Sequence, residues 1–504
     1  MQKPTSLPKS CDVLIIGAGP VGAALANLLG KHGVDVVLIE RHQGILEIPR
    51  AVHLDGETMR IIQNMGLAPE ALKILRQGSV MQWVNAKHEL LLERRAVIGL
   101  GAHGWHNNNY YHQPQLEAVF RSGISRFPHV QLHEGWTLKA AVDQGHCVEA
   151  TLVATQDEKV ESLICAKYMV GCDGAKSMVR GLLSKDQAFD TLADPQAWVV
   201  VDGVLDHPLN QPEWSVQYCD PKRPATGIFI NATRRRWELM VLPGEDGQEL
   251  LKEEVLWDLL SKWVKPTQVK LERAAIYTFH ASLAKVWQRG RIAIAGDAAH
   301  QTPPFLGQGL CAGLRDAANL SWKLVHALGQ TNTSSGLLKT YEIERYPHAR
   351  AFIELAVEVG DVIQELDPTK AAERDARMLK EGMSFMFPSP VLGNGLHRAR
   401  ENAPMVGQIG PQFEMADGRW SDDLAPGAWA LWVRDATALT STLKQQAADL
   451  GMPVVEADTE AMNAWLNKHQ ALAAIMRPDH YIYDLCIDSE TLARSLGQLA
   501  KELM

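Results

Sequence analysis

Three glycines and one carboxylate near the N-terminus have the spacing of a turn that binds a dinucleotide. Gly17, Gly19 and Gly22 follow a short apolar run, and Glu40 ends the next apolar run. Such glycines permit a tight strand-to-helix turn and let the backbone approach a pyrophosphate, whose charge the helix N-terminus stabilises. A carboxylate at the spacing of Glu40 binds a ribose hydroxyl. Residues 11–41 therefore predict a strand–helix–strand unit that binds a dinucleotide at its turn.

Two later stretches place a carboxylate where a parallel sheet binds its ligands. Asp173 lies in an Asp-Gly turn after a strand-like run, with Ser177 and Arg180 on the helix expected next, beside phosphates. Asp297 ends another such run, and a loop rich in Pro and Gly follows it. Because ligands of open α/β sheets bind beyond the carboxyl ends of strands, Asp297 is placed to hold a polyol hydroxyl. Either stretch alone is an ordinary turn, whereas the three motifs in this order predict one binding site.

The elements that must position these residues make up an α/β protein. The length of 504 residues suggests about three domains. The patterns predict a Rossmann-type nucleotide-binding domain interleaved with an antiparallel sheet, and then a third unit with strands and helices of its own. The expected parts are residues 10–190 and 285–365 for the nucleotide-binding domain, 191–284 for the sheet, 366–425 for an irregular linker and wrap-around segment, and 426–504 for the C-terminal unit.

Charge and cysteine spacing narrow the class of protein. The formal net charge of −9 argues against nucleic acid or an anionic membrane as the main partner. The seven cysteines are scattered and form no C-x-x-C pair, so a disulfide framework or a zinc site is not expected and a reducing compartment fits. The sequence shows no signal-peptide pattern and no long uninterrupted apolar run. We therefore expect a cytoplasmic protein that binds a small molecule.

The three motifs together resemble the class A, single-component FAD-dependent aromatic hydroxylases, which are the p-hydroxybenzoate hydroxylase-like flavoprotein monooxygenases. The resemblance covers roughly residues 10–365. The strings PPFLGQGLCAGLRDAANLSWKL, RRWELM and YEIERYPHA look closest to the 3-(3-hydroxyphenyl)propionate, phenol and resorcinol hydroxylases. The C-terminal unit resembles the thioredoxin-like domain of these relatives. It lacks C-x-x-C, and Cys486 is its one cysteine, so we expect a packing or homodimer-contact role for it and no redox role.

The resemblance implies FAD as the cofactor, NADH or NADPH as the electron-donating cosubstrate, and O2 as the oxidant, with no metal. It places the pyrophosphate at the glycine turn, the adenosine ribose at Glu40, the ribityl chain at Asp297, and the isoalloxazine ring at residues 307–310. The motif around Asp173 is associated with both FAD and NAD(P)H. The implied cofactor-binding residues are Gly17, Gly19, Pro20, Gly22, Glu40, Arg41, Arg50, Gln113, Asp173, Asp297, Pro304, Gly307, Gln308, Gly309 and Leu310.

The activity implied by the resemblance is hydroxylation of a phenolic or similarly electron-rich ring through a flavin C4a-hydroperoxide, most like that of a 3-(3-hydroxyphenyl)propionate hydroxylase. One alternative is a monooxygenase of the same fold that opens, epoxidises or tailors a heteroaromatic or polyketide substrate. Another is a dinucleotide-binding protein without enzymatic activity. The intact set of three motifs argues against that last reading, because a binding module has no need of Asp297 and its glycine loop.

Residues that handle the substrate are harder to identify from the sequence. A phenol has a pKa near 10, so an acid–base group is expected beside the ring. His53 is the first candidate, since a helix is expected over residues 50–65 and would place it near the flavin. Tyr110 and His112 are weaker candidates. The expected substrate-binding wall consists of Trp214, Tyr218, Phe229, Met240 and Phe305.

Overall fold

A parallel sheet carries the three motifs. The computed structural model describes residues 6–47, 50–95, 99–184, 188–330, 336–381, 390–398 and 403–504. Ile16 pairs with Gly171, and Gly171 pairs with Ile294, so the three ligand loops leave the sheet at one edge. The parallel strands lie in the order β18 (Ile292–Ile294), β11 (Asp157–Gly171), β1 (Ser10–Ile16), β2 (Val36–Glu40) and β8 (Val130–Glu134), with β17 (Gln288–Arg289) antiparallel at one end.

Helices pack closely against the first sheet next to the three motifs. The helix α1 (Pro20–Gly30) packs between α8 (Gly309–Gly329) and α4 (Gln113–Ile124), and its small apolar residues are buried on almost every side. A Cβ at Gly313 would lie 2.6 Å from the Val21 side chain, so α8 approaches α1 more closely than a larger residue allows. Further helices of this part are α2 (Gly56–Asn64), α3 (Ala68–Leu72), α5 (Met178–Leu183) and α9 (Lys339–Ile363).

A disulfide joins Cys147 and Cys165 in an antiparallel extension of the first sheet. The extension consists of β9 (Trp136–Asp143), β10 (Val148–Ala154) and the first part of β11. The expectation that disulfides are absent is wrong for this pair. The two cysteines meet because β10 pairs antiparallel with β11, and a separation of 18 residues gives no sign of that. Among the described residues the other five cysteines form no disulfide.

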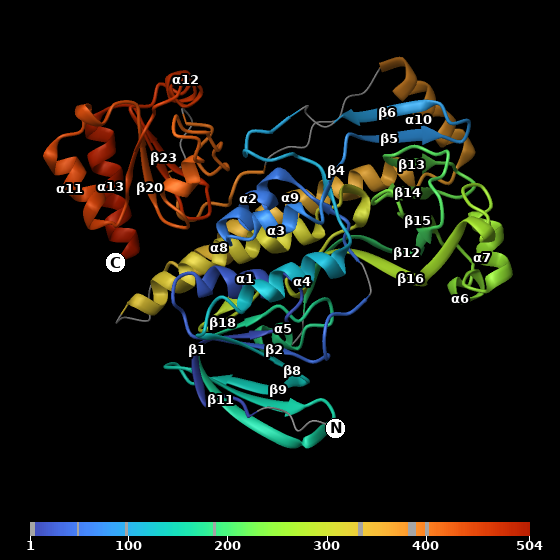
Figure 1. The fold of residues 1–504 in the computed structure, drawn as a ribbon, viewed down its shortest axis with the longest axis horizontal. Helices are drawn as coiled ribbons and strands as arrows, with labels where there is room; N and C mark the ends of the chain where they lie inside the picture. Colours follow the sequence, from blue (N-terminus) through green and yellow to red (C-terminus); the bar gives the residue numbers. More distant parts are fainter. Residues whose placement is uncertain are drawn as a thin grey trace.

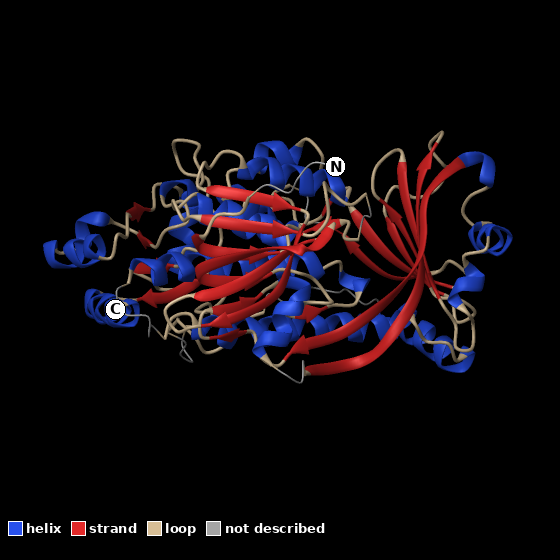
Figure 2. Ribbon diagram, turned by 90° about the horizontal axis from the view of Figure 1, so that it is seen from below, coloured by secondary structure: helices blue, strands red, loops and turns tan. Residues whose placement is uncertain are grey.

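The second sheet is the predicted antiparallel layer, and it draws on more of the chain than residues 191–284. Two strands from residues 80–95 join its edge, where β5 pairs in parallel with β13. Figure 2 shows this sheet as a strongly twisted fan at one end of the molecule. Its order is β19 (His300–Gln301), β16 (Val269–Ala284), β12 (Phe189–Leu205), β15 (Arg234–Met240), β14 (Ala225–Phe229), β13 (Ser215–Cys219), β5 (Val80–Asn85) and β6 (Leu90–Arg95).

The two faces of the second sheet have different neighbours. The face that carries Trp198, Cys219 and Met240 packs against Phe305 and α9, and is called the inner face below. The opposite, outer face carries Val199 and its alternating neighbours, and packs against the short helices α6 (Gly247–Leu250) and α7 (Glu253–Leu260). Figure 1 shows these two helices on the side of the sheet that points away from α1 and α8.

Two predicted elements differ from the structure. The chain around His53 is not the start of a helix but the short strand β3 (His53–Leu54), which pairs with β7 (Asn109–Tyr110), as does β4 (Arg76–Gln77). The helix α2 begins only at Gly56, because the Asp55 side chain caps it by accepting a hydrogen bond from Thr58 N. The segment 366–425, expected to be irregular, contains α10 (Pro368–Glu381). Proline is often found in irregular segments, but Pro368 is the first residue of this helix, and proline fits the first turn of a helix.

The C-terminal unit contains strands and helices of its own, as predicted. Its strands lie in the order β21 (Val454–Glu456), β20 (Ala430–Val433), β22 (Ala473–Met476) and β23 (Ile482–Cys486), with only the β20–β21 pair parallel. Its helices are α11 (Ser441–Asp449), α12 (Glu460–Lys468) and α13 (Ser489–Leu503). Figure 1 shows the unit beside α2 and α8. In the described part of the chain, no helix is long and apolar enough to cross a membrane.

Candidate active site

The glycine turn after β1 leaves open space at one of its three glycines. A Cβ at Gly17, whose φ is 101°, would lie 2.4 Å from the carbonyl oxygen of Cys172, and a Cβ at Gly22 would lie 2.0 Å from that of Gly17. A Cβ at Gly19 would meet no atom within 4 Å. Gly19 is also the N-cap of α1 and provides no side-chain cap, so the first N–H groups of the helix face this space. The turn therefore fits a pyrophosphate.

Glu40 is held beside this turn by two backbone groups. Its carboxylate accepts hydrogen bonds from Ala18 N at 3.0 Å and His42 N at 2.9 Å. Arg121 on α4 donates to the Ala18 carbonyl at 3.1 Å and lies 4.0 Å from Glu40, so it fixes the turn from the other side. The sequence analysis missed Arg121, because no local pattern connects it with a turn about a hundred residues earlier. Arg41 is exposed next to Glu40.

The backbone at Arg50 is fixed from two sides. The Gln113 side-chain oxygen accepts from Arg50 N at 2.8 Å and from Ala51 N at 2.7 Å. Arg236, on the inner face of the second sheet, donates to the Arg50 carbonyl at 2.6 Å. The amide oxygen of Gln113 is therefore committed to the loop that carries Arg50, and its predicted contact with the cofactor is left to its amide nitrogen.

Asp173 has a role within the turn that follows β11. Its carboxylate accepts from Met178 N at 2.7 Å and Val179 N at 3.2 Å, and it also accepts from the Ser177 hydroxyl. Both oxygens therefore cap the short helix α5. Arg180 on that helix donates to the Ala298 carbonyl at 3.1 Å. The chain itself uses these groups to tie α5 to the Asp297 turn, and their position beside phosphates stays a prediction.

Asp297 lies in a recess at the end of β18. Its side chain is open to solvent, yet the protein surrounds it closely enough that burial raises its pKa. Gly296, with a φ of 63°, makes the turn, and its N–H donates to Asp316 at 3.0 Å. Asp316 on α8 also binds His300 at 2.7 Å and Arg345 at 2.9 Å. Burial raises the pKa of Asp316, but its interactions with His300 and Arg345 outweigh burial, and the pKa is lowered.

The loop before α8 brings His53 next to Gly307. The short helix η3 (Pro304–Leu306) ends at Gly307, which has a φ of 63°. His53 Nδ1 lies 3.4 Å from the Gly307 carbonyl oxygen, and the Tyr110 ring lies 5.8 Å away, edge to face. Gln308 is the N-cap of α8, and its side-chain oxygen accepts from Arg315 at 3.1 Å instead of capping the helix.

His53 is buried and carries no charge at neutral pH. Burial, together with the nearby Arg94, lowers its pKa to about 4. A histidine is an acid–base candidate because its usual pKa lies near neutrality, and burial removes that property here, which the sequence could not show. Its Nε2 atom is buried and makes no hydrogen bond of ordinary geometry within the described part of the chain, although the Asn108 side chain lies close enough to raise the pKa of the ring. Since Nδ1 faces a carbonyl oxygen, Nδ1 carries the proton and Nε2 is an acceptor.

Only two of the five expected substrate-wall residues lie on the inner face. Met240 and Phe305 belong to the cluster there, with the Phe305 ring 5.7 Å from Trp198. The other three follow the alternation of the outer face, so this position does not favour them as wall residues, and their assignment stays a prediction. They are Tyr218, which packs against Trp263, Phe229, which follows the alternation of Ala225, and Trp214, which extends that of Tyr218.

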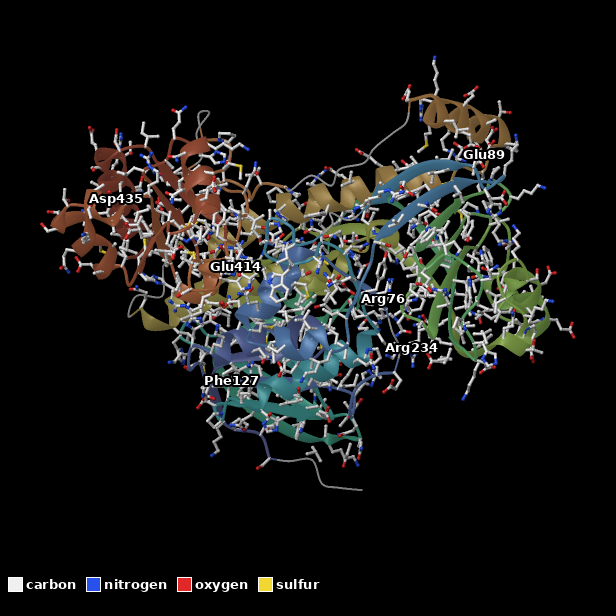
Figure 3. The ribbon with its side chains drawn as sticks, turned by 45° about the horizontal axis from the view of Figure 1, so that its top comes forward. Arg76, Glu89, Phe127, Arg234, Glu414 and Asp435 are labelled. Atoms are coloured by element: carbon white, nitrogen blue, oxygen red, sulfur yellow. A yellow bond between two sulfur atoms is a disulfide. The ribbon has the colours of Figure 1, made fainter. Side chains whose placement is uncertain are left out.

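Polar residues of the inner face complete the site, and the sequence analysis missed them. Asp202 binds Arg236 at 2.8 Å and also pairs with Arg273. Burial raises the pKa of Glu238, which lies 3.7 Å from Arg236. Near the rim, the Arg76 guanidinium lies 5.0 Å from the Tyr110 ring centroid, and Figure 3 shows Arg76 where the N-terminal part meets the second sheet. Tyr110 accepts from the Ser215 hydroxyl at 2.9 Å, whereas His112 begins α4 and has a pKa lowered by burial.

Comparisons with known proteins find relatives along nearly the whole chain. A family model described as FAD binding domain matches residues 10–356. The chain is 34% identical to a "Probable NADH-specific resorcinol 4-hydroxylase" of Rhodococcus jostii, covering 100% of this chain and 96% of the relative. It is 35% identical to a "3-(3-hydroxy-phenyl)propionate/3-hydroxycinnamic acid hydroxylase 2" of Burkholderia vietnamiensis, covering 94% of this chain and 93% of the relative.

Solved structures share the fold over nearly the whole chain. A ternary complex of aklavinone-11 hydroxylase with FAD and aklavinone superposes with a TM-score of 0.81 at 21% identity, covering 99% of this chain and 100% of that one. The rebeccamycin biosynthetic enzyme RebC with reduced flavin gives a TM-score of 0.79 at 20% identity, covering 99% of each chain. At these identities the likeness concerns the fold alone.

Proposed function

We infer from its membership of the FAD binding domain family, to which this chain belongs, that it is an FAD-dependent aromatic monooxygenase and hydroxylates a small phenolic compound. NADH is proposed as the electron donor and O2 as the oxidant, in line with the printed name of the Rhodococcus relative. The proposed substrate is a 3-(3-hydroxyphenyl)propionate-type phenol, with resorcinol as the nearest competitor.

The residues at the edge of the first sheet fit FAD. Gly17, Gly19 and Gly22 would hold the pyrophosphate with α1, Glu40 the adenosine ribose, and Asp297 the ribityl chain. When bound, the flavin supplies the acceptance of hydride from NADH and the activation of O2. The protein contributes rigid positioning, since the Asp297 turn and the Gly307 loop are each tied to buried side chains of α8.

One observation carries the phenol assignment. The Nε2 atom of His53 is a buried acceptor that makes no hydrogen bond of ordinary geometry among the described residues, and its ring lies beside the loop proposed to contact the isoalloxazine ring. An unmade buried hydrogen bond costs about 1–3 kcal/mol, so a ligand that donates there is favoured. A phenolic hydroxyl is such a donor. We assign His53 the role of orienting this hydroxyl and drawing its proton toward Nε2, which makes the ring a stronger nucleophile.

The inner face of the second sheet supplies the remaining wall. Met240, Phe305 and Trp198 form its apolar part, which excludes water from the reacting ring. The ionic group of Asp202, Arg236 and Arg273 lies on the same face and reaches the Arg50 backbone. This group couples the wall to the loop that lies next to the cofactor, so the substrate and FAD sites share one rigid boundary.

Substrate turnover tests the proposal directly. The purified protein is incubated with FAD, NADH and either 3-(3-hydroxyphenyl)propionate, resorcinol or a polycyclic phenol, and both NADH consumption and hydroxylated product are measured. We expect a dihydroxylated product from a single-ring phenol in near-equal amount to the NADH consumed. A protein that binds FAD but forms product only from the polycyclic phenol, or NADH oxidation without any product, would contradict the substrate assignment. Failure of the folded protein to bind FAD would contradict the function as a whole.

The division of the chain into domains is part of the same proposal. We assign residues 10–190 and 285–365 to FAD binding, 191–284 to the core of the substrate sheet, and 426–504 to a thioredoxin-like domain. The strand order β21-β20-β22-β23, with one parallel and two antiparallel pairs, supports that last assignment. Cys486 is the one cysteine of this unit, so no dithiol cycle operates inside it.

A further inference from the structure

We propose that the C-terminal unit (residues 426–504) is a positioning element of the flavin site and acts through the hydroxyl group of Tyr481, which links it to both loops proposed to hold the flavin. The inference rests on the proposed FAD site. The unit thereby takes part in the reaction, although it has no C-x-x-C pair and none of its residues belongs to the set proposed to bind FAD.

The turn between β22 and β23 docks the unit through buried charges. Arg477 binds Glu344 of α9 at 2.7 Å, and both side chains are fully buried. Asp479 accepts from Asn319 of α8 at 2.9 Å. Such pairs hold only when their geometry is kept, because separating a buried charge from its partner costs about 3–5 kcal/mol. The turn is thus locked against the two long helices that run behind the flavin loops.

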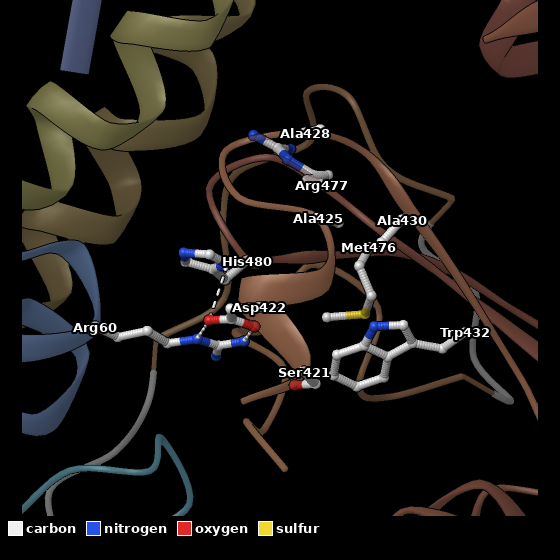
Figure 4. A pocket seen from close by; sticks show the side chains of 10 residues that line it. All are labelled: Arg60, Ser421, Asp422, Ala425, Ala428, Ala430, Trp432, Met476, Arg477 and His480. Carbon is white, nitrogen blue, oxygen red and sulfur yellow. Dashed lines mark hydrogen bonds and ion pairs between the residues drawn. The ribbon is translucent and has the colours of Figure 1, made fainter. Parts of the chain in front are cut away.

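A second docking point lies against α2. Figure 4 shows Arg60 reaching from α2 to Asp422, and His480 approaching the same carboxylate from the turn of the C-terminal unit. Arg60 forms an ion pair with Asp422 and donates to the Gly410 carbonyl at 2.6 Å. The His480 ring lies 3.4 Å from Asp422. Asp422 and Gly410 belong to the segment before the unit, so His480 ties the unit to α2 through that segment. Together with the contacts to α8 and α9, this gives Tyr481 a defined position between the three helices.

The first arm of the network runs from Tyr481 to the loop at Gly307. The Tyr481 hydroxyl donates to Glu57 of α2 at 2.9 Å. The other oxygen of Glu57 accepts from Arg315 at 2.6 Å, and Arg315 donates to the side chain of Gln308 at 3.1 Å. Gln308 begins α8 and lies in the stretch proposed to contact the isoalloxazine ring. Arg315 also pairs with Asp55, which follows β3 and its His53.

The second arm runs from the same hydroxyl to the Asp297 turn. His348 lies 3.2 Å from the Tyr481 oxygen, and its other nitrogen accepts from Arg345 at 2.6 Å. Arg345 binds Asp316 at 2.9 Å, and Asp316 accepts from Gly296 N at 3.0 Å. With Nδ1 accepting, the proton of the neutral His348 is on Nε2 and is donated to Tyr481. One hydroxyl therefore accepts from one arm and donates to the other.

The two arms meet at the hydroxyl group of Tyr481, whereas the packing of its aromatic ring is not part of the network. Removing only the oxygen frees a donor on His348 and an acceptor on Glu57, both deep in the protein, and a buried group left without its partner drives a local rearrangement. Tyr483 offers a matched control. It lies in β23, which begins one residue after Tyr481, and it is buried as Tyr481 is, but its hydroxyl donates to Glu502 inside the C-terminal unit at 2.8 Å.

The experiment compares Tyr481→Phe with Tyr483→Phe and the unaltered protein. FAD is titrated into each apoprotein, the flavin reduction potential is measured, and hydrogen exchange is followed over residues 294–312 without FAD. We expect Tyr481→Phe to bind FAD about tenfold more weakly, which corresponds to the ~1.4 kcal/mol of one hydrogen bond, with a shifted potential and faster exchange in both loops. Tyr483→Phe should alter none of the three.

The outcomes separate this inference from the proposed function. If the unaltered protein binds FAD and Tyr481→Phe matches it in affinity, potential and exchange, the positioning role is refuted and the function stands. Equal changes in both variants refute it as well, since they would show a general loss of stability. If Tyr481→Phe does not fold, Glu57→Gln tests the same arm from α2, and unchanged exchange over residues 305–312 in that variant would equally overturn the proposal.

Discussion

The glycine turn after β1 and the inner face of the second sheet bound one site but are built from different parts of the chain. Backbone atoms shape the turn, where a Cβ at Gly22 would lie 2.0 Å from a carbonyl oxygen. Side chains shape the inner face, where Asp202, Arg236 and Glu238 form a buried ionic group. The turn therefore accepts only glycine at its close-packed positions, whereas side chains of the inner face can be replaced without changing the backbone of the sheet. This difference lets one fold keep its cofactor and vary its substrate.

The largest effect is expected at the turn. In Gly22→Ala the added Cβ overlaps the Gly17 carbonyl, and neither backbone segment can move without separating α1 from β1. We expect a loss of more than about 3 kcal/mol in stability, together with the loss of FAD binding. Thermal unfolding of the apoprotein and FAD titration measure the two effects.

Gly19→Ala is the matched control for this variant. A Cβ there meets no protein atom within 4 Å, so the apoprotein should unfold at the same temperature as the unaltered protein. FAD should still bind more weakly, because the methyl group enters the space assigned to the pyrophosphate. An apoprotein as unstable as that of Gly22→Ala, or unaltered FAD affinity, would show that the open space at Gly19 is not the ligand's place.

At Asp297, in contrast to the glycine turn, a side chain should matter for FAD binding. Asp297→Ala removes a carboxylate that points into an open recess, so folding should be unaffected. FAD binding should weaken by about 1.5–3 kcal/mol, the value of a hydrogen bond to a charged group. The comparison is with Asp297→Asn, which keeps an acceptor and should lose less. Titration of the two apoproteins with FAD gives the difference, and equal affinity in all three proteins would remove Asp297 from the ribityl chain.

The sequence predicted the part of the site that depends on backbone and left out the part that depends on tertiary contacts. Glycine at positions 17, 19 and 22 directly indicates a backbone turn. The register of Ile16 with Gly171 follows from three similar strand ends. Nothing local reports that Tyr218 faces outward or that Tyr481 reaches Glu57 across 424 residues. The bond between Cys147 and Cys165 was missed for the same reason.

A pair of substitutions on the second sheet tests which face binds the substrate. Met240→Ala opens space on the inner face beside Phe305, whereas Tyr218→Phe removes only a hydroxyl on the outer face. We expect Met240→Ala to raise the KM for the phenol about tenfold, the effect of roughly 1.4 kcal/mol of lost apolar contact, with FAD affinity unchanged. Tyr218→Phe should leave KM and kcat as they are. Steady-state kinetics with product quantification would contradict the assignment if the two results were reversed.

The smallest effect at neutral pH is expected from the charge state of His53. Because its pKa in the folded protein is about 4, below the usual value of 6.5, the unfolded chain binds the proton more strongly. Stability should therefore be full above about pH 6.5 and fall as the pH is lowered toward 4, by up to about 3 kcal/mol from this residue. His480, whose pKa burial also lowers to about 4, adds a loss of the same sign.

In His53→Gln the midpoint of thermal unfolding should drop less between pH 7 and 4.5 than in the unaltered protein. Hydroxylation by this variant should be slower, because Gln is a poor proton acceptor, yet its pH profile between 6 and 8 should keep its shape. If the pH profile of hydroxylation instead lost an ionisation near pH 7 in His53→Gln, His53 would titrate there in the unaltered protein. Ligand binding would then have raised the pKa of His53.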